Sequence, residues 1–278
     1  MSISNDILKE TRKALVGKDH ILRKVYTAIL AGGHVLLEDV PGVGKTTLAL
    51  AFSRAMSLNY SRMQFTPDVL PSDIVGFSMP DKTTGNMIYK PGAILCNLFL
   101  ADELNRATSR TQSALLEAME ENQVTVDGVS HPLPAPFIVI ATQNPTGAAG
   151  TQLLPDSQMD RFMIRLSIGY PDPRSETEML KLHSADSAGE PVKAVTDAAG
   201  LAAIRRQAAN VYIADSVCDY IVALVAATRR SDYITRGASP RASLAVAAMA
   251  RATAWIDGRD YVVPEDVAGV LIDCLAHR

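Results

Sequence analysis

A glycine-rich segment constrains the fold of this 278-residue chain more than any other feature of its sequence. The apolar run His34–Leu37 predicts a buried strand before the segment, and residues from about 45 to 56 predict a helix after it. A loop without bulky side chains lets backbone N–H groups converge on a phosphate chain at the N-terminus of the following helix. We therefore predict a phosphate-binding loop in an α/β fold, made by Pro41, Gly42, Val43, Gly44, Lys45, Thr46 and Thr47.

The residues of this loop have separate expected tasks. Gly42 and Gly44 leave room for the phosphates. Lys45 is expected to reach the β- and γ-phosphates of a nucleotide, and Thr46 is expected to place its hydroxyl on Mg²⁺. The usual motif has a glycine where this chain has Asp39. A glycine-rich turn that merely starts a helix is the simpler alternative, but a Gly-Lys-Thr ending is rarely needed for folding alone.

A second strand supplies carboxylates. The run Leu98–Ala101 predicts a buried strand that leads directly into Asp102 and Glu103, before a helix at about 109–120. An aspartate at the end of a strand can hold the Mg²⁺ shell, and the adjacent glutamate can activate an attacking water, which is hydrolase chemistry. The pair could also simply end a strand in solvent, but the phosphate loop favours the hydrolytic interpretation. Phe137–Ala141 predicts a third strand, and such fully apolar runs suit a parallel sheet.

The chain changes character near residue 171. We expect an α/β core over residues 1–172 and an all-helical lid over 173–278, because the later part is Ala-rich with helical periodicity. Thr196 and Ser239 are placed to cap two of its helices. The predicted lid helices lie at about 174–184, 197–209, 215–230, 240–257 and 264–276.

Composition excludes several classes of protein. The net charge of −3 and the aromatic content of 5% argue against a nucleic-acid-binding surface. No uncharged apolar run is long enough to span a membrane, so no membrane span is expected. The spacing of the three cysteines, Cys96, Cys218 and Cys274, does not match a metal-binding motif. Unpaired cysteines of this kind are most compatible with a reducing cytoplasm.

Five motifs in order resemble the MoxR family of AAA+ ATPases, over nearly the whole chain. An aspartate at position 39 is usual in that family. The motifs are residues 38–46 (Glu-Asp-Val-Pro-Gly-Val-Gly-Lys-Thr), 100–107 (Leu-Ala-Asp-Glu-Leu-Asn-Arg-Ala), 141–145 (Ala-Thr-Gln-Asn-Pro), 159–162 (Met-Asp-Arg-Phe) and 237–242 (Gly-Ala-Ser-Pro-Arg-Ala).

The resemblance implies roles for further residues. Asn144 matches the sensor 1 asparagine, which orients the attacking water. Arg161 matches the arginine finger, which reaches the nucleotide of the neighbouring subunit and neutralises charge on the γ-phosphoryl oxygens. Arg241 matches sensor 2, expected to contact the γ-phosphate of its own subunit. Val16 and Gly17 resemble the segment that borders adenine.

Two inserted features also fit this family. The segment 66–91 contains too many Pro, Gly and Asp residues for one plain helix, and in the family it contains an insert within the second helix of the core. A hairpin at about 122–133, built around Asp127-Gly128, precedes the third strand. The resemblance implies that both face the pore or axial surface of a ring, where a substrate is gripped. A long surface connection is the alternative.

The resemblance finally implies a function. A ring-forming ATPase, expected to be a hexamer of this chain, would use ATP and Mg²⁺ to remodel a client protein or to insert a metal or cofactor into it. Typical partners of the family contain von Willebrand factor A domains. The alternatives are the ATPase subunit of a magnesium chelatase, a DNA-translocating motor and a non-hydrolysing scaffold. Glu103 and Asn144 argue against the scaffold.

Overall fold

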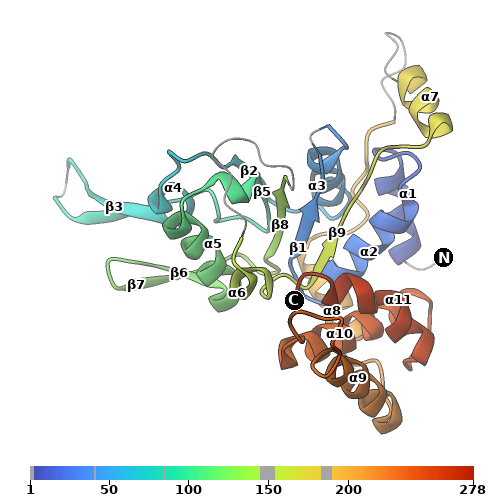
Figure 1. Cartoon of the computed structure of the whole chain (residues 1–278). Coiled ribbons are helices and arrows are strands. Elements are labelled where there is room, and N and C mark those ends of the chain that lie inside the picture. Colours follow the sequence, from blue (N-terminus) through green and yellow to red (C-terminus); the bar gives the residue numbers. More distant parts are fainter. Residues whose placement is uncertain (1–2, 41, 84, 145–153, 183–189) are drawn as a thin grey trace.

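The computed structural model describes residues 3–40, 42–83, 85–144, 154–182 and 190–278. A five-stranded parallel sheet with helices on both faces forms the core, and further helices gather at one end of it (Figure 1). The strand order is β2-β5-β8-β1-β9. This confirms the predicted α/β core with helices in the C-terminal part.

The central strands of the sheet are the apolar runs that the sequence predicts. Every residue of β5 and β8 is buried, as expected for strands covered on both faces. The short β9 and the polar edge strand β2 were not predicted, because neither has an apolar run of useful length. The strands are β1 (Val35–Glu38), β2 (Tyr60–Gln64), β5 (Leu98–Asp102), β8 (Ile138–Gln143) and β9 (Ile164–Leu166).

Alternate side chains of the strands enter two separate cores. Leu98 and Leu100 of β5 pack with α1 (Ile3–Arg12), α2 (Asp19–Leu30) and α3 (Lys45–Ala55) on one face. The intervening Phe99 and Ala101 pack with α5 (Ser109–Glu121) on the other face. The helices at 45–56 and 109–120 are confirmed, whereas α1 and α2 were not predicted. Short helices α4 (Pro71–Val75), η1 (Leu104–Arg106) and α6 (Asp156–Met159) lie in the connections.

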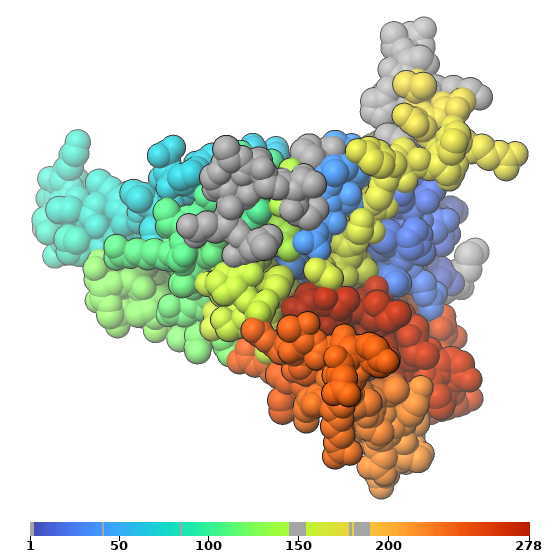
Figure 2. Space-filling view, viewed as in Figure 1, coloured from blue at the N-terminus to red at the C-terminus, as the bar shows by residue number. Residues whose placement is uncertain are grey.

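Two hairpins project from the core on the side away from the later helices (Figure 2). Residues 66–91 form α4 and the hairpin β3 (Gly76–Pro80)–β4 (Met87–Pro91), so this segment is not one plain helix. The predicted hairpin before the third strand is β6 (Gln123–Val126)–β7 (Val129–Pro132). The rings of Tyr89 and His131 stack at a centroid distance of 3.7 Å, which joins the two hairpins. Stacking of this kind makes them one structural unit.

The C-terminal helices agree with the predicted ranges to within two residues at each end. The helix α10 packs against α2, α8 and α9, and its Val246 and Met249 belong to the same apolar cluster as the first face of the sheet. These helices are α7 (Pro173–Leu182), α8 (Ala198–Ala209), α9 (Asp215–Thr228), α10 (Pro240–Ile256) and α11 (Pro264–Leu275). Within the described ranges, no helix has both the length and the apolar character needed to cross a membrane.

Of the two predicted helix caps, one lies at its predicted position and one does not. The cap of α8 is Asp197, whose Oδ1 accepts the N–H of Gly200 at 2.8 Å, and not Thr196. Ser239 occupies the N-cap position of α10, but its hydroxyl donates to Asp160 at 3.1 Å and makes no capping hydrogen bond. A carboxylate is a stronger acceptor than a hydroxyl, so Asp197 caps α8 in place of Thr196, and the Asp160 carboxylate binds the hydroxyl of Ser239.

Candidate active site

The sheet brings the predicted phosphate loop and the predicted acidic pair to the same edge. The loop follows β1, Asp102 ends β5 and Asn144 follows β8, and β8 lies between the other two strands in the sheet. Since all three strands are parallel, their carboxyl ends meet at one edge, which is where open α/β sheets bind ligands. Two spacings of about 4.8 Å separate the three strands, so the site spans about 10 Å across the sheet.

The phosphate loop has the backbone conformation that its glycines permit. Gly42 and Gly44 have φ values of 88° and 95°, in the left-handed region that favours glycine. Lys45 starts α3, and its ammonium donates to the carbonyls of Asp39 and Val40 at 2.7 and 3.2 Å. Partial burial lowers the pKa of Lys45, and the charge of Asp102 opposes this shift. The ammonium thus lies over the loop, within the electrostatic influence of Asp102 at the end of β5.

The remaining predicted loop residues differ in solvent exposure. Val43 and Thr46 are half-buried and Thr47 is exposed, on the loop and the first turn of α3. Pro41 was also predicted to contact ATP, but it lies outside the described residues.

Asp39 explains why this loop departs from the usual motif. Its carboxylate is buried and accepts three hydrogen bonds, from the N–H of Val40 at 3.0 Å, the hydroxyl of Ser167 at 3.1 Å and the N–H of Gly169 at 2.7 Å. The last two partners follow β9. Asp39 therefore ties the start of the phosphate loop to the edge strand, a task that glycine has no side chain to perform.

The segment predicted to border adenine lies beside the phosphate loop. A Cβ at Gly44 would stand 3.2 Å from the side chain of Leu15, so residues 15–17 run close to the loop. Gly17 has a φ of 72°, and a Cβ there would lie 2.1 Å from Oγ of Ser175 at the start of α7. The close packing at Gly17 thus excludes any larger residue. Val16 is half-buried next to it.

The predicted magnesium ligand Asp102 is held by two partners. Its Oδ1 accepts the hydroxyl of Thr142 on β8 at 2.7 Å, and its Oδ2 pairs with Arg62 of β2 at 2.7 Å. A carboxylate and the Thr46 hydroxyl are hard oxygen donors of the kind that Mg²⁺ prefers. The residues present therefore fit a magnesium site.

Glu103, the predicted base, has a left-handed backbone with a φ of 57°. Its N–H donates to the hydroxyl of Thr142 at 2.8 Å, so one threonine holds both acidic residues in place. Its carboxylate pairs with Arg106 at 2.7 Å. A non-glycine residue in this region of backbone space costs free energy, and such positions cluster at functional sites.

Asn144 ends the described part of the third motif. Its backbone carbonyl accepts a hydrogen bond from the Asn105 side chain at 3.2 Å, so it lies close to the turn that follows Glu103. The site thus contains the Lys45 loop, Asp102, Glu103 and Asn144 at one edge of the sheet.

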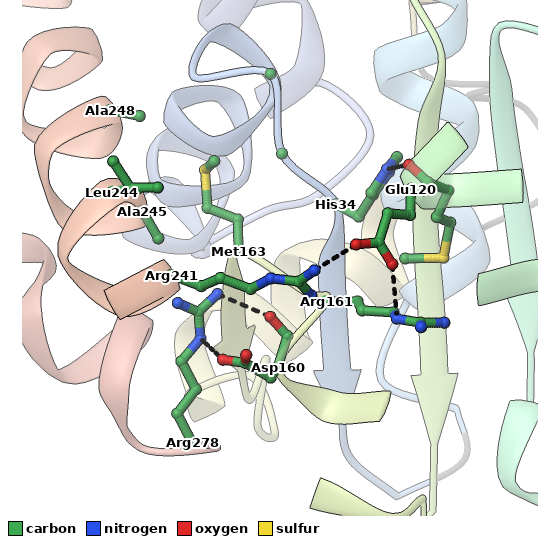
Figure 3. Close-up of a pocket in the computed structure, with 13 residues that line it drawn as sticks. His34, Glu120, Asp160, Arg161, Met163, Arg241, Leu244, Ala245, Ala248 and Arg278 are labelled. Atoms are coloured by element: carbon green, nitrogen blue, oxygen red, sulfur yellow. Dashed lines mark hydrogen bonds and ion pairs between the residues drawn. The ribbon is translucent and has the colours of Figure 1, made fainter. Parts of the chain in front are cut away.

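The two predicted arginines lie at the opposite edge of the sheet. Arg161 and Arg241 both pair with Glu120 at the end of α5, and all three line a cavity of about 430 Å³ (Figure 3). The preceding residue of α5, Met119, accepts a hydrogen bond from His34, which stands immediately before β1. The phosphate loop follows the other end of β1, which is about 13 Å long at ~3.3 Å per residue.

The structure therefore does not bring Arg241 to the phosphate loop of its own subunit, where the resemblance placed it. The reason is the packing of α10 against α2 and α8. This packing directs the first turn of α10 to the amino ends of the strands, where Arg241 meets Arg161. The helices α8 to α11 thus gather at the amino ends of the strands, away from the phosphate loop (Figure 1).

His34 is buried at this second edge and is neutral. Its Nδ1 accepts the N–H of Val139 at 2.9 Å, so Nε2 carries the proton and donates to the Met119 carbonyl. Burial lowers the pKa of His34 to about 4. Protonation would place a second N–H against that of Val139.

Acid is therefore expected to destabilise the protein through His34. The unfolded histidine binds a proton below about pH 6.5 and the folded one does not until about pH 4, so stability falls as the pH drops through this window. Between about pH 7.5 and about pH 5 the loss from His34 is about 2 kcal/mol. Urea unfolding at both pH values should show a smaller loss for His34→Asn, which keeps a donor and an acceptor. An equal loss in both proteins would contradict the assignment.

Several residues at these two edges have no role in the sequence-based prediction. Thr142 lies inside a recognised motif, and Arg62 and Arg106 lie close to the acidic pair in sequence or in the sheet. A hydroxyl or guanidinium at those positions is by itself only a weak sequence signal for a functional residue. Glu120 has no signal in the sequence at all, because its partners are distant in the chain.

Comparison with known proteins identifies the class of protein. The profile of the "ATPase family associated with various cellular activities (AAA)" matches residues 34–164, and that of the "AAA lid domain" matches residues 226–278. Together with the phosphate loop and the acidic pair, these matches define an AAA+ ATPase with a helical lid. It is an ATP hydrolase.

Individual relatives narrow the class to a family. The chain is 39% identical to "Chaperone MoxR1" of Mycobacterium tuberculosis, over 97% of this chain and 73% of that protein. It is 43% identical to YeaC of Bacillus subtilis, described as uncharacterised, over 98% of this chain and 85% of that protein. The chain belongs to the MoxR family of AAA+ ATPases. A crystal structure of a protein from Cytophaga hutchinsonii, provisionally described as an ATPase, superposes with a TM-score of 0.91 and 38% identity, over 99% of this chain and 87% of that chain.

Proposed function

We propose that this protein hydrolyses ATP with Mg²⁺ in a ring of identical subunits and uses the cycle to remodel or mature a client protein. The main support for this proposal is that the proposed catalytic groups lie at two opposite edges of the sheet. Lys45, Asp102 and Glu103 lie at one edge of the sheet, while Arg161 and Arg241 lie at the other. The arginines of one subunit can then serve only the nucleotide of another subunit.

A head-to-tail arrangement of subunits solves this geometry. Such heterologous contacts close into rings when the rotation allows, and each ring interface then joins the phosphate-loop edge of one subunit to the arginine edge of the next. We propose six subunits. A monomer would hold both halves of the site but could not use them together, so assembly would control hydrolysis.

The residues of the phosphate-loop edge divide the chemistry. The loop N–H groups and Lys45 bind the β- and γ-phosphates. Glu103 accepts the proton of the attacking water, and Asn144 orients that water. Thr46 and Asp102 would hold Mg²⁺, which neutralises phosphate charge when it is bound. The pairs Arg62–Asp102 and Arg106–Glu103 must open for these roles, because each now occupies a carboxylate oxygen.

The arginine edge supplies what the neighbour lacks. A guanidinium is planar, permanently charged and suited to the oxygens of a phosphoryl group. Arg161 and Arg241 from the next subunit would stabilise the charge that grows on the γ-phosphoryl oxygens. Arg241 belongs to α10, so nucleotide contact there would also couple the helical lid of one subunit to the nucleotide of its neighbour.

Client contact is proposed for the paired hairpins. Phe77, Met87, Ile88 and Val129 are large apolar side chains that the hairpins expose. The Tyr89–His131 stack holds the two hairpins together, so both can present these side chains to the same client. Family membership supports a partner with a von Willebrand factor A domain. The three free thiols suit the cytoplasm.

Complementation between two inactive variants tests the trans role of Arg161. Arg161→Ala is expected to lower the assembled hydrolysis rate by about 10³-fold, the usual minimum effect of an arginine finger. Mixing it with Lys45→Ala, which keeps Arg161, should create interfaces with an intact loop and an intact arginine. Random mixing would give about a quarter of such interfaces in a closed ring. Phosphate release by the mixture measures them.

Controls make the result decisive. Arg110→Ala removes an exposed guanidinium from α5 and should keep wild-type activity. Native mass spectrometry would show that the two variants share rings. Mixed rings without any regained hydrolysis would contradict the proposal that Arg161 acts in trans.

A further inference from the structure

Glu120 is the meeting point of two arginines from different parts of the chain. Its Oε1 accepts a hydrogen bond from Arg241 in the first turn of α10, and its Oε2 lies 3.3 Å from Nε of Arg161, which precedes β9 (Figure 3). The last turn of α5 thus ties the helical lid and the core together through one carboxylate. The proposed mechanism of ATP hydrolysis assigns no role to Glu120.

These contacts are weak enough to be exchanged. The side chains of Glu120 and Arg241 are 38% and 51% exposed, and ion pairs of this exposure contribute little. Nε of Arg161 is shielded from solvent yet makes no hydrogen bond, although Glu120 is within ion-pair distance. A shielded, unused donor is available to a better-placed or more highly charged anion.

The surrounding charges favour such an anion. Asp160, the other carboxylate of the cavity, already pairs with the buried Arg278 and accepts the hydroxyl of Ser239. His34 at the cavity wall is uncharged. Among the described residues that line the cavity, Glu120 and Asp160 face Arg161, Arg241 and Arg278, and this leaves a net positive charge at the cavity. A triphosphate carries more negative charge than one carboxylate and offers several acceptor oxygens.

The geometry points to Glu120 as an anion that occupies the trans arginines until nucleotide arrives, an inference that rests on the proposed function. In the free protomer its carboxylate stands in for the phosphate and holds Arg161 and Arg241 side by side. When the neighbouring subunit presents ATP, the two guanidiniums leave Glu120 for the triphosphate. Glu120 therefore competes with nucleotide, and it sets the ATP concentration at which subunits join.

Nucleotide-driven assembly in the absence of hydrolysis tests this competition. In a Glu103→Gln background, the ATP concentration at half-maximal assembly would be measured by analytical ultracentrifugation, with and without Glu120→Gln. The amide removes the charge but keeps the size of the side chain. We expect the midpoint to fall about three- to tenfold, the factor that two part-exposed ion pairs contribute together. Glu120→Asp, which keeps the charge, should restore most of the original midpoint.

A matched control lies one residue further along the helix. Glu121 is exposed, so Glu121→Gln makes the same change of charge and should leave the midpoint within about twofold. An unchanged or raised midpoint for Glu120→Gln would overturn the role of Glu120 while leaving the trans arginines intact. If the Glu103→Gln parent does not assemble with ATP at all, the proposed ring function itself fails. The two failures are therefore distinct.

Discussion

Lys45→Ala is expected to lose ATP binding by at least about 100-fold, because the ammonium is proposed to make charge-assisted hydrogen bonds to two phosphates, and such bonds are worth about 1.5–3 kcal/mol each. In the structure its ammonium already lies over the loop, on the carbonyls of Asp39 and Val40. Equilibrium titration with a fluorescent ATP analogue measures the effect.

The fold should survive this substitution. Partial burial disfavours the charged form of Lys45, so removing the ammonium also removes a desolvation cost. Thermal unfolding without nucleotide should therefore change little. Arg54→Ala, at the exposed far end of the same helix, removes a cation and should keep full affinity. Affinity of Lys45→Ala within about threefold of wild type would show that the loop does not bind the phosphates through this residue.

Glu103→Gln is expected to bind ATP normally and to hydrolyse it about 10²–10⁴ times more slowly, because the amide cannot accept the proton of the attacking water. The substitution keeps an oxygen that can accept from Arg106, so the local structure should persist. Thr142 holds the backbone of this residue whatever its side chain. Single-turnover hydrolysis, measured beside equilibrium binding, separates the chemical step from affinity.

A charge-matched variant controls for this experiment too. Glu117→Gln, on the exposed side of α5, should hydrolyse ATP at the wild-type rate. If Glu103→Gln keeps more than about a tenth of the wild-type rate, another group must be the base. Asp102 would then be the first candidate, since it ends the same strand.

Much of the fold could be predicted because its signals are local. The buried strands are continuous apolar runs, and the lid helices show helical periodicity with Pro240 and Pro264 at their first turns. The polar β2, the three-residue β9 and the helices α1 and α2 were missed. Strands β2 and β9 are held by pairing with neighbouring strands, and such pairing leaves little trace in the sequence of the strand itself.

The candidate site divides in the same way. Gly42, Gly44 and Lys45 are recognisable because a phosphate loop needs their properties in a fixed order along the chain. The task of Asp39 became clear only in the structure, where its carboxylate reaches Ser167 and Gly169 after the edge strand. A side chain that joins distant segments has no spacing rule to reveal it.

The sequence by itself determined the phosphate loop, the acidic pair and the helical lid, because each depends on neighbouring residues and on strand or helix periodicity. Only the tertiary structure decided that Arg241 lies beside Arg161 and Glu120, at the edge of the sheet away from its own phosphate loop. That position follows from the packing of α10 on α2 and α8. Side-chain packing between segments far apart in the chain sets the position of α10 on the core, and no local sequence pattern encodes that position.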